Sequence, residues 1–131
     1  MIFDKDLIQK INLIENLTNA KVKDILVKDK LIIIVEQGEI SKAIGKKGKN
    51  IKIIERVMHK KVRVIEFDKD PVKFIKNFIY PIKAEITVNN DIKIKVDDRR
   101  TKGLLIGRES RNLIELNKLT KDYFNLSVKV L

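Results

Sequence analysis

Apolar side chains recur along this chain with periods of about 3.6 and 2 residues, which predict helices and strands respectively. Leu7, Ile11 and Ile14 share one helical face, and the β-branched run over 31–35 is typical of a buried strand. The first half is therefore predicted to form helix, strand, strand, helix, helix and strand, over residues 4–19, 22–27, 31–35, two short helices within 40–58, and 62–67.

A new helix is predicted to begin after a boundary at residues 68–71. Asp70 is a natural N-cap and Pro71 a natural first helical residue, and Phe74 and Phe78 follow on the apolar face. We place two domains at residues 1–68 and 69–131. The remaining elements of the second half are predicted over residues 82–88, 92–96, 103–106, 113–123 and 126–130.

The two halves align at an offset of 62 residues, which superimposes residues 44–51 on 106–113. The same offset pairs strand residues of the two halves, Ile32 with Ile94 and Ile34 with Val96. A repeat of this length is a structural unit used twice. We predict an α+β fold of two α-β-β-α-α-β domains.

The turn Gly45-Lys46-Lys47-Gly48 has the residue types of a phosphate site. Gly45 can end the preceding helix with a positive φ, and Gly48 lets a ligand backbone approach closely. The next helix then begins with exposed amide donors and the positive end of its dipole. Lysines at 46, 47 and 49 add charge, so we expect this stretch to bind a phosphate backbone.

Positive charge is concentrated around this turn. The formal net charge of the 131 residues is +11, and residues 42–63 carry nine basic side chains and one acid, Glu55. The rest of the first half is net negative. A general bias of the surface toward lysine would not leave the flanking segments acidic, so the patch indicates a polyanion partner.

The matching turn of the second half, Gly107-Arg108-Glu109-Ser110, departs from this pattern. Ser110 can cap the next helix, but its side chain obstructs the closest approach of a ligand. Glu109 repels phosphate, whereas Arg108 and Arg111 partly compensate. The second turn is therefore a weaker candidate for the same role.

Helix-strand-strand-helix-helix-strand with Gly-x-x-Gly between the last two helices resembles the type II KH domain. This resemblance implies that each domain is a three-stranded sheet with helices packed on one face. Two copies joined by a very short linker are similar to the tandem KH module of NusA transcription factors, and the match resembles the short archaeal NusA-like proteins. The resemblance implies a single-stranded RNA-binding factor of transcription termination or antitermination. It leaves contact with RNA polymerase, or with other transcription or translation machinery, open.

The resemblance also implies which residues touch RNA. The first loop would contact the RNA backbone, while Ile44, Ile51 and the neighbouring strand would line a groove for bases. The residues expected to bind RNA are Ile44, Gly45, Lys46, Lys47, Gly48, Lys49, Ile51, Lys52, Gly107, Arg108, Ser110 and Arg111.

Other functions fit the residues less well. A Walker loop needs glycine and Ser or Thr where this chain has Ala43 and Asn50. Asp97-Asp98 has no further ligand at metal-site spacing and is interpreted as a polar strand end. The β-branched strands argue against a helix-turn-helix protein, and few aromatic residues argue against an RRM or OB fold. A KH protein of ribosome association or assembly stays the alternative.

The composition limits the classes of protein to which this chain can belong. The chain has no cysteine, one histidine, no apolar run near the roughly 18 residues of a membrane span, and no signal-peptide pattern. We expect a cytoplasmic, monomeric protein that is not an enzyme, holds no cofactor or metal, and does not bind a membrane.

Overall fold

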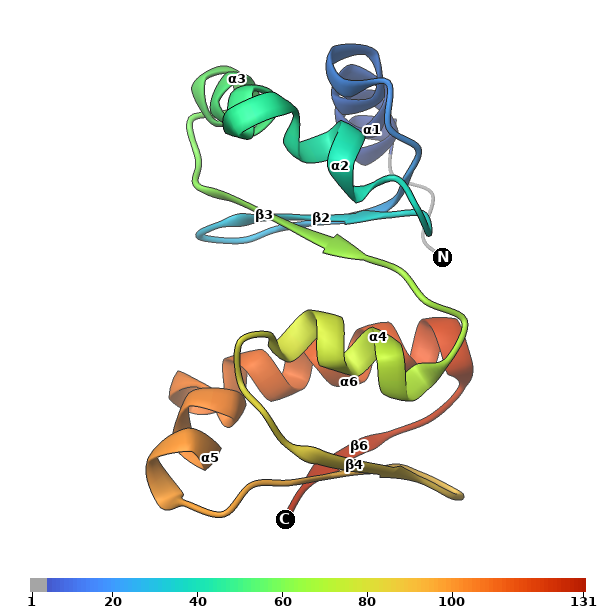
Figure 1. The fold of residues 1–131 in the computed structure, drawn as a ribbon, viewed down its shortest axis with the longest axis vertical. Coiled ribbons are helices and arrows are strands. Elements are labelled where there is room, and N and C mark those ends of the chain that lie inside the picture. Colours follow the sequence, from blue (N-terminus) through green and yellow to red (C-terminus); the bar gives the residue numbers. More distant parts are fainter. Residues whose placement is uncertain (1–4) are drawn as a thin grey trace. The chain divides into compact units, whose positions relative to one another are not determined.

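The computed structural model describes residues 5–131, so Asp4, the predicted first residue of the first helix, lies outside the described residues. The chain divides into two compact units, the first ending at Asp68 and the second beginning at Lys69. Each unit has the order α-β-β-α-α-β, with a 3-10 turn between its last two helices (Figure 1). The predicted α+β class and element order are confirmed.

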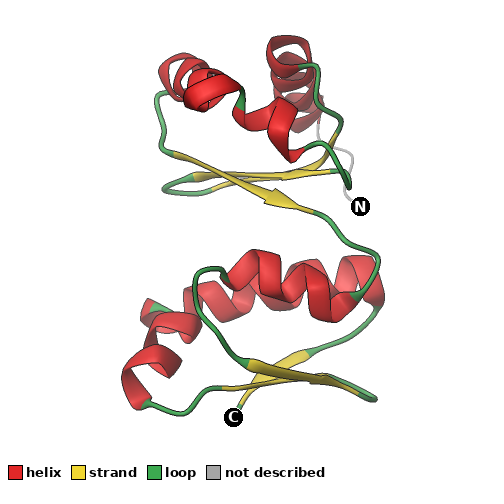
Figure 2. Cartoon of the chain, in the orientation of Figure 1, coloured by secondary structure: helices red, strands yellow, loops and turns green. Residues whose placement is uncertain are grey.

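The described part of the first unit consists of α1 (Lys5–Thr18), β1 (Val22–Val27), β2 (Leu31–Val35), α2 (Ile40–Ile44), the 3-10 turn η1 (Lys46–Gly48), α3 (Lys49–Met58) and β3 (Val62–Glu66). Its sheet has the order β1-β2-β3. β2 is antiparallel to β1 and parallel to β3, because α2 and α3 carry the chain back along the sheet before β3 begins. The helices lie on one face of this sheet, as predicted (Figure 2).

The core of the first unit lies between that face and the helices. β2 supplies Leu31, Ile33 and Val35, which alternate along the strand and therefore point to the same side. They pack with Ile54 of α3 and with further buried residues, namely Ile14, Ala20, Ile25 and Ala43. Burial of each large aliphatic side chain stabilises the fold by about 1.5–3 kcal/mol. α2 and α3 are thus anchored on both sides of the turn that joins them.

The second unit consists of α4 (Pro71–Ile79), β4 (Glu85–Val88), β5 (Ile92–Lys95), α5 (Arg99–Ile106), the 3-10 turn η2 (Arg108–Ser110), α6 (Arg111–Phe124) and β6 (Val128–Val130). Its sheet has the order β4-β5-β6, with β5 antiparallel to β4 and parallel to β6. Asp70 Oδ1 accepts a 3.0 Å hydrogen bond from the Val72 N–H, and Pro71 takes the first helical position. The predicted start of this helix is confirmed.

Aromatic side chains of α4 and α6 pack together in the second unit. Phe74 is 0 % exposed, and its ring centroid lies 5.6 Å from that of Tyr123 and 5.9 Å from that of Phe124, in edge-to-face geometry. Phe78 is also buried. The placement of Phe74 and Phe78 on the apolar face of their helix is confirmed.

In the second unit, the largest differences from the predicted boundaries are at the starts of β4 and α5. The strand predicted from residue 82 begins at Glu85, because the chain first turns, with the Ile82 N–H bonded to the Ile79 carbonyl at 2.9 Å. Asp98 is more than a polar strand end: its Oδ2 accepts a 3.0 Å hydrogen bond from the Thr101 N–H and caps α5. The first half of α5 is polar, so hydrophobic spacing revealed only its last half.

The predicted pairing of strand residues between the repeats, Ile32 with Ile94 and Ile34 with Val96, is wrong by one residue. Ile94 of β5 is 0 % exposed and holds the position that Ile33 holds in β2, as the pairing of each strand with its neighbours shows. The segment between β5 and its glycine turn is one residue longer than its counterpart. The strands therefore align at an offset of 61 residues and the turns at 62.

Candidate nucleic-acid interface

The turn between α2 and α3 has a backbone that only glycine adopts easily at its first position. Gly45 has φ 76° and ψ 168°, a region essentially restricted to glycine. Lys47, with φ 55° and ψ 29°, and Gly48, with φ 74° and ψ 17°, are left-handed. Apart from the adjoining backbone, no heavy atom lies within 4 Å of the position that a Cβ would take at Gly48, so the space beside Gly48 is open to a ligand.

Asn50, in the first turn of α3, packs behind this turn. Its Nδ2 donates a 2.8 Å hydrogen bond to the carbonyl oxygen of Lys42 in α2. A Cβ atom at Gly45 would lie 2.8 Å from Asn50 Cγ and 2.9 Å from the Asn50 backbone nitrogen. Glycine is therefore required at position 45 both for its backbone conformation and for the close packing of Asn50.

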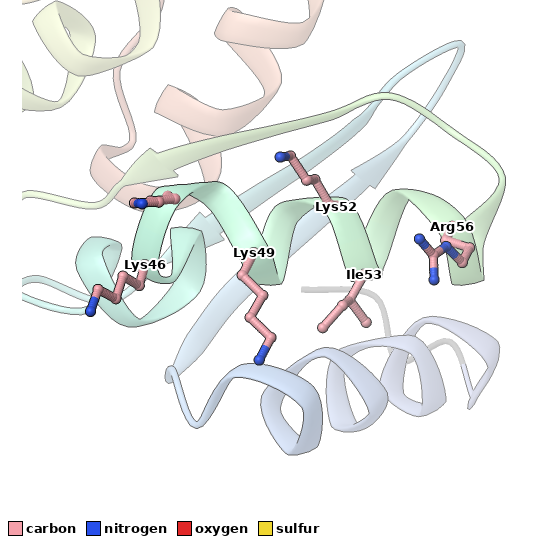
Figure 3. A pocket seen from close by; sticks show the side chains of 6 residues that line it. Lys46, Lys49, Lys52, Ile53 and Arg56 are labelled. Carbon is pink, nitrogen blue, oxygen red and sulfur yellow. The ribbon is translucent and has the colours of Figure 1, made fainter.

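A groove of ≈ 460 Å³ lies beside the turn on the surface of α3. It is lined by Lys46, Lys47, Lys49, Lys52, Ile53 and Arg56 (Figure 3). The five cationic residues are exposed and Ile53 is half-buried. No carboxylate belongs to this set of lining residues. Cations around one aliphatic side chain suit a polyanion that also presents apolar faces, as phosphates and bases do in a nucleic acid.

The two acids nearest to this patch in sequence are engaged elsewhere. Glu55 Oε2 accepts a 2.9 Å hydrogen bond from the Val62 N–H, which ties α3 to β3. Glu39 accepts one from the Lys21 N–H, which lowers the pKa of the Glu39 carboxyl, and its other oxygen lies 3.4 Å from Lys42 Nζ. Lys42 is thus partly neutralised, and the charge of the patch rests on the lysines and Arg56 that line the groove.

The structure brings the predicted lysines together but leaves two predicted apolar residues outside the groove. Ile44 is the last residue of α2 and Ile51 lies in the first turn of α3, and both are half-buried. Neither belongs to the groove lining, where Ile53 supplies the apolar surface instead. The expectation that Ile44 and Ile51 line a base groove stays a prediction.

The second turn has the same backbone as the first. Gly107 has φ 80° and ψ 167°, Glu109 has φ 57° and ψ 32°, and Ser110 has φ 59° and ψ 21°. Asn112 Nδ2 donates a 3.1 Å hydrogen bond to the Leu104 carbonyl oxygen, which repeats the contact that Asn50 makes. Ser110 occupies the N-cap position of α6, but its side chain makes no capping hydrogen bond, so the predicted cap is wrong.

The chemistry around the two turns differs although their backbones agree. Five positions around the first turn are all lysine: Lys42, Lys46, Lys47, Lys49 and Lys52. The corresponding positions of the second turn hold Leu104, Arg108, Glu109, Arg111 and Ile114. Leu104 and Ile114 are 60 % and 62 % exposed. The second turn therefore presents the same shape with a much weaker positive field.

Sequence reasoning missed three residues of this region. Ile53 and Arg56 line the groove. They follow Lys49 by four and seven residues, a helical spacing that places all three on one side of α3. Asn50 braces the turn, and its recurrence as Asn112, five residues after the first glycine of each turn, was the available signal.

Residues 5–131, the described part of the chain, show neither a metal-binding cluster nor a membrane-spanning helix. No group of three or more His, Asp or Glu side chains there is arranged to hold a metal ion. None of the helices in this range combines the length and the apolar character needed to cross a bilayer.

A family model for the NusA-like second KH domain matches residues 10–70, a range that falls almost entirely on the first unit. Among solved structures, the crystal structure of APE1850 is similar with a TM-score of 0.75 at 23 % identity, covering 98 % of this chain and 100 % of that one. At this level of identity the likeness concerns the fold.

Two curated archaeal proteins, each named probable transcription termination protein NusA, are similar over most of the chain. The protein from Methanocaldococcus jannaschii is 33 % identical, and the alignment covers 95 % of this chain and 72 % of that protein. The protein from Methanococcus vannielii is 35 % identical, and the alignment covers 81 % of this chain and 65 % of that protein.

Proposed function

Because this chain belongs to the archaeal NusA-like family of KH proteins, we propose that it binds single-stranded RNA as a factor of transcription termination or antitermination in the cytoplasm. The family is an RNA-binding family and not a family of enzymes. The single observation that carries RNA binding is the groove beside Gly45–Gly48, which is lined by five cations and no carboxylate. The termination role rests on the names of the relatives.

The first turn binds the RNA backbone through shape and charge together. The open space beside Gly48 allows a sugar-phosphate backbone to approach the start of α3, whose N-terminus carries no side-chain cap. Phosphate there meets the positive end of the helix dipole. The exposed lysines at 46, 47, 49 and 52 add Coulombic attraction. Ile44 and Ile51 flank the turn and contact the bases nearest to it.

The second turn contributes less affinity. Gly107 and Ser110 reproduce the backbone of the first turn, and Arg108 and Arg111 are exposed beside them. Glu109 stands where the first turn has Lys47, so the local field on a phosphate is weaker. The second turn therefore binds RNA more weakly than the first.

Titration of a labelled single-stranded RNA followed by fluorescence anisotropy, repeated over a range of salt, tests RNA binding. If about four to six phosphates are neutralised, the slope of log affinity against log salt is about −3 to −4. A matched DNA duplex should bind more weakly. An affinity that does not depend on salt, or a preference for the duplex, would contradict the proposal.

Crosslinking and sequencing of the RNA bound in cells tests the transcription role. Enrichment of nascent transcripts supports a termination or antitermination factor. Enrichment confined to ribosomal RNA would overturn that role in favour of ribosome association or assembly, while leaving RNA binding itself in place.

A further inference from the structure

We propose that Ile53 and Arg56 form a nucleotide subsite on α3, so that the RNA strand continues from the Gly45–Gly48 turn along this helix. The inference rests on the proposed RNA binding and adds a second segment to its path. It assigns the far end of the groove a role in gripping RNA longer than the roughly four nucleotides that a KH loop clamps.

The geometry of α3 supports a continuous path. Lys49, Ile53 and Arg56 are spaced by four and three residues, so they lie along one side of the helix. In Figure 3 this row begins next to the turn and runs toward the C-terminal end of α3. At a rise of about 1.5 Å per residue, Arg56 lies about 10 Å beyond Lys49 along the helix axis. A strand bound at the turn must therefore continue along α3 to contact Arg56.

The side chains of this row fit a nucleotide rather than a bare anion. Arg56 is exposed and presents a planar guanidinium, which can bind phosphate oxygens or stack on a base. Ile53 is half-buried, and among the described residues it lies outside the core cluster of the first unit. An aliphatic surface between Lys49 and Arg56 offers a base a face to pack on while its phosphates meet the cations.

The row formed by Lys49, Ile53 and Arg56 is not repeated in the second unit. The positions of α6 that correspond to Ile53 and Arg56 hold Glu115 and Lys118. A carboxylate in the middle of the row would repel a phosphate backbone and would offer a base no apolar face. The combination of cation, aliphatic residue and cation is thus specific to the first unit, where the cationic groove lies.

The test compares two lengths of single-stranded RNA by fluorescence anisotropy, one of about four nucleotides and one of about ten. Arg56→Gln should weaken binding of the longer RNA about fivefold and make its salt slope shallower by about 0.7. Ile53→Ser should weaken the longer RNA to a similar degree without changing the slope, because no phosphate contact is lost. Neither variant should change binding of the short RNA.

A fully abasic version of the longer RNA separates the two roles: Arg56→Gln should still weaken its binding, whereas Ile53→Ser should not. Lys73→Gln, on the exposed face of α4, is the control for loss of one positive charge. Circular dichroism checks whether each variant is folded. Because Arg56 is exposed, Arg56→Gln should fold and tests the subsite even if Ile53→Ser does not fold.

The possible outcomes separate the subsite from the proposed function. If Arg56→Gln behaves like Lys73→Gln, or weakens both RNA lengths equally, the subsite is wrong. If the double variant Lys46→Asp with Lys47→Asp loses RNA binding in that case, the proposal that the turn binds RNA is kept. If that loop variant binds both lengths as the native protein does, the proposed function itself falls.

Discussion

The side-chain amide of Asn50 donates a 2.8 Å hydrogen bond to the carbonyl oxygen of Lys42, joining the helix before the glycine turn to the helix after it. In the second unit Asn112 makes the same contact to Leu104 at 3.1 Å. Both turns are therefore braced by an asparagine outside the glycine segment. The backbone shape of each turn therefore depends on this contact as well as on the glycines.

Replacing Asn50 by alanine should loosen the first turn while leaving its cations in place. Loss of one hydrogen bond costs about 0.5–1.5 kcal/mol, which for a unit of this size lowers the melting temperature by about 4–8 °C per kcal/mol. We also expect a several-fold weaker affinity for single-stranded RNA, because the turn no longer holds one conformation. Asn16→Ala, on the exposed side of α1, is the control. Unchanged RNA affinity in Asn50→Ala would mean that the turn keeps its shape without the brace.

The two glycines of the first turn should respond differently to substitution. Gly45→Ala places a Cβ 2.8 Å from Asn50 Cγ and in a glycine-only backbone region, so we expect a loss of stability greater than about 1–3 kcal/mol. Gly48→Ser keeps a backbone conformation that Ser110 adopts in the second unit. It should therefore lower the free energy of unfolding by only about 1–2 kcal/mol. Thermal melting of both variants measures the difference. Equal losses would contradict this account of the turn.

Gly48→Ser also tests whether RNA approaches the turn closely. The serine side chain would enter the open space beside position 48, so RNA affinity should fall even though the variant is folded. The reciprocal change, Ser110→Gly, should leave the second turn intact and strengthen binding of long RNA slightly. An affinity that does not change in Gly48→Ser would show that the backbone of RNA stays away from this glycine.

The second turn should matter less than the first. Arg108→Asp with Arg111→Asp makes the same change of charge as Lys46→Asp with Lys47→Asp. We expect a smaller loss of RNA affinity from it, because Glu109 already weakens the field around the second turn. The two double variants can be compared in one anisotropy experiment at constant salt. A larger effect from the arginines would show that the second turn is the stronger RNA-binding site.

Asp98 should make the stability of the second unit sensitive to acid. Hydrogen bonds from the Thr101 side chain and N–H lower the pKa of the Asp98 carboxyl. The ionised form therefore stabilises the fold above the unfolded-state pKa of about 3.9, and this contribution is lost as pH falls through the lower folded-state pKa. Denaturation of Asp98→Ala should differ most from the native protein near neutral pH and converge with it in acid. A difference that does not vary with pH would contradict the role of the charge.

The sequence predicted the element order because the apolar periods agree with the local signals at most boundaries. Asp70 and Pro71 mark the start of α4 by capping chemistry, and the run from Leu31 to Val35 is buried throughout, as its composition suggests. The prediction failed where the period was absent. The polar first half of α5 left no apolar stripe, and its start was marked only by Asp98, a cap mistaken for a strand end.

The glycine turn and its lysines could be predicted because each signal was local in the sequence. The groove could not be predicted, because it depends on which side chains lie together on one side of α3. The sequence alone placed neither Ile53 nor Arg56 of that side in the core or in the binding site. Ile53 was overlooked for this reason, although it lies four residues after Lys49. The strand offset failed because one extra residue in a connecting segment is invisible to a fixed-offset comparison.

We propose above that the Gly45–Gly48 turn is the site where this protein binds single-stranded RNA. The most direct test is the RNA affinity of Lys46→Asp with Lys47→Asp, against the matched control Lys73→Asp with Lys76→Asp on the exposed face of α4. Since both lysines of the turn are exposed, the melting temperature should barely change. We expect the RNA affinity of the loop variant to fall by well over tenfold, about 1.4 kcal/mol or more, and that of the control to fall much less. Native-like affinity in the folded loop variant would contradict RNA binding at this turn.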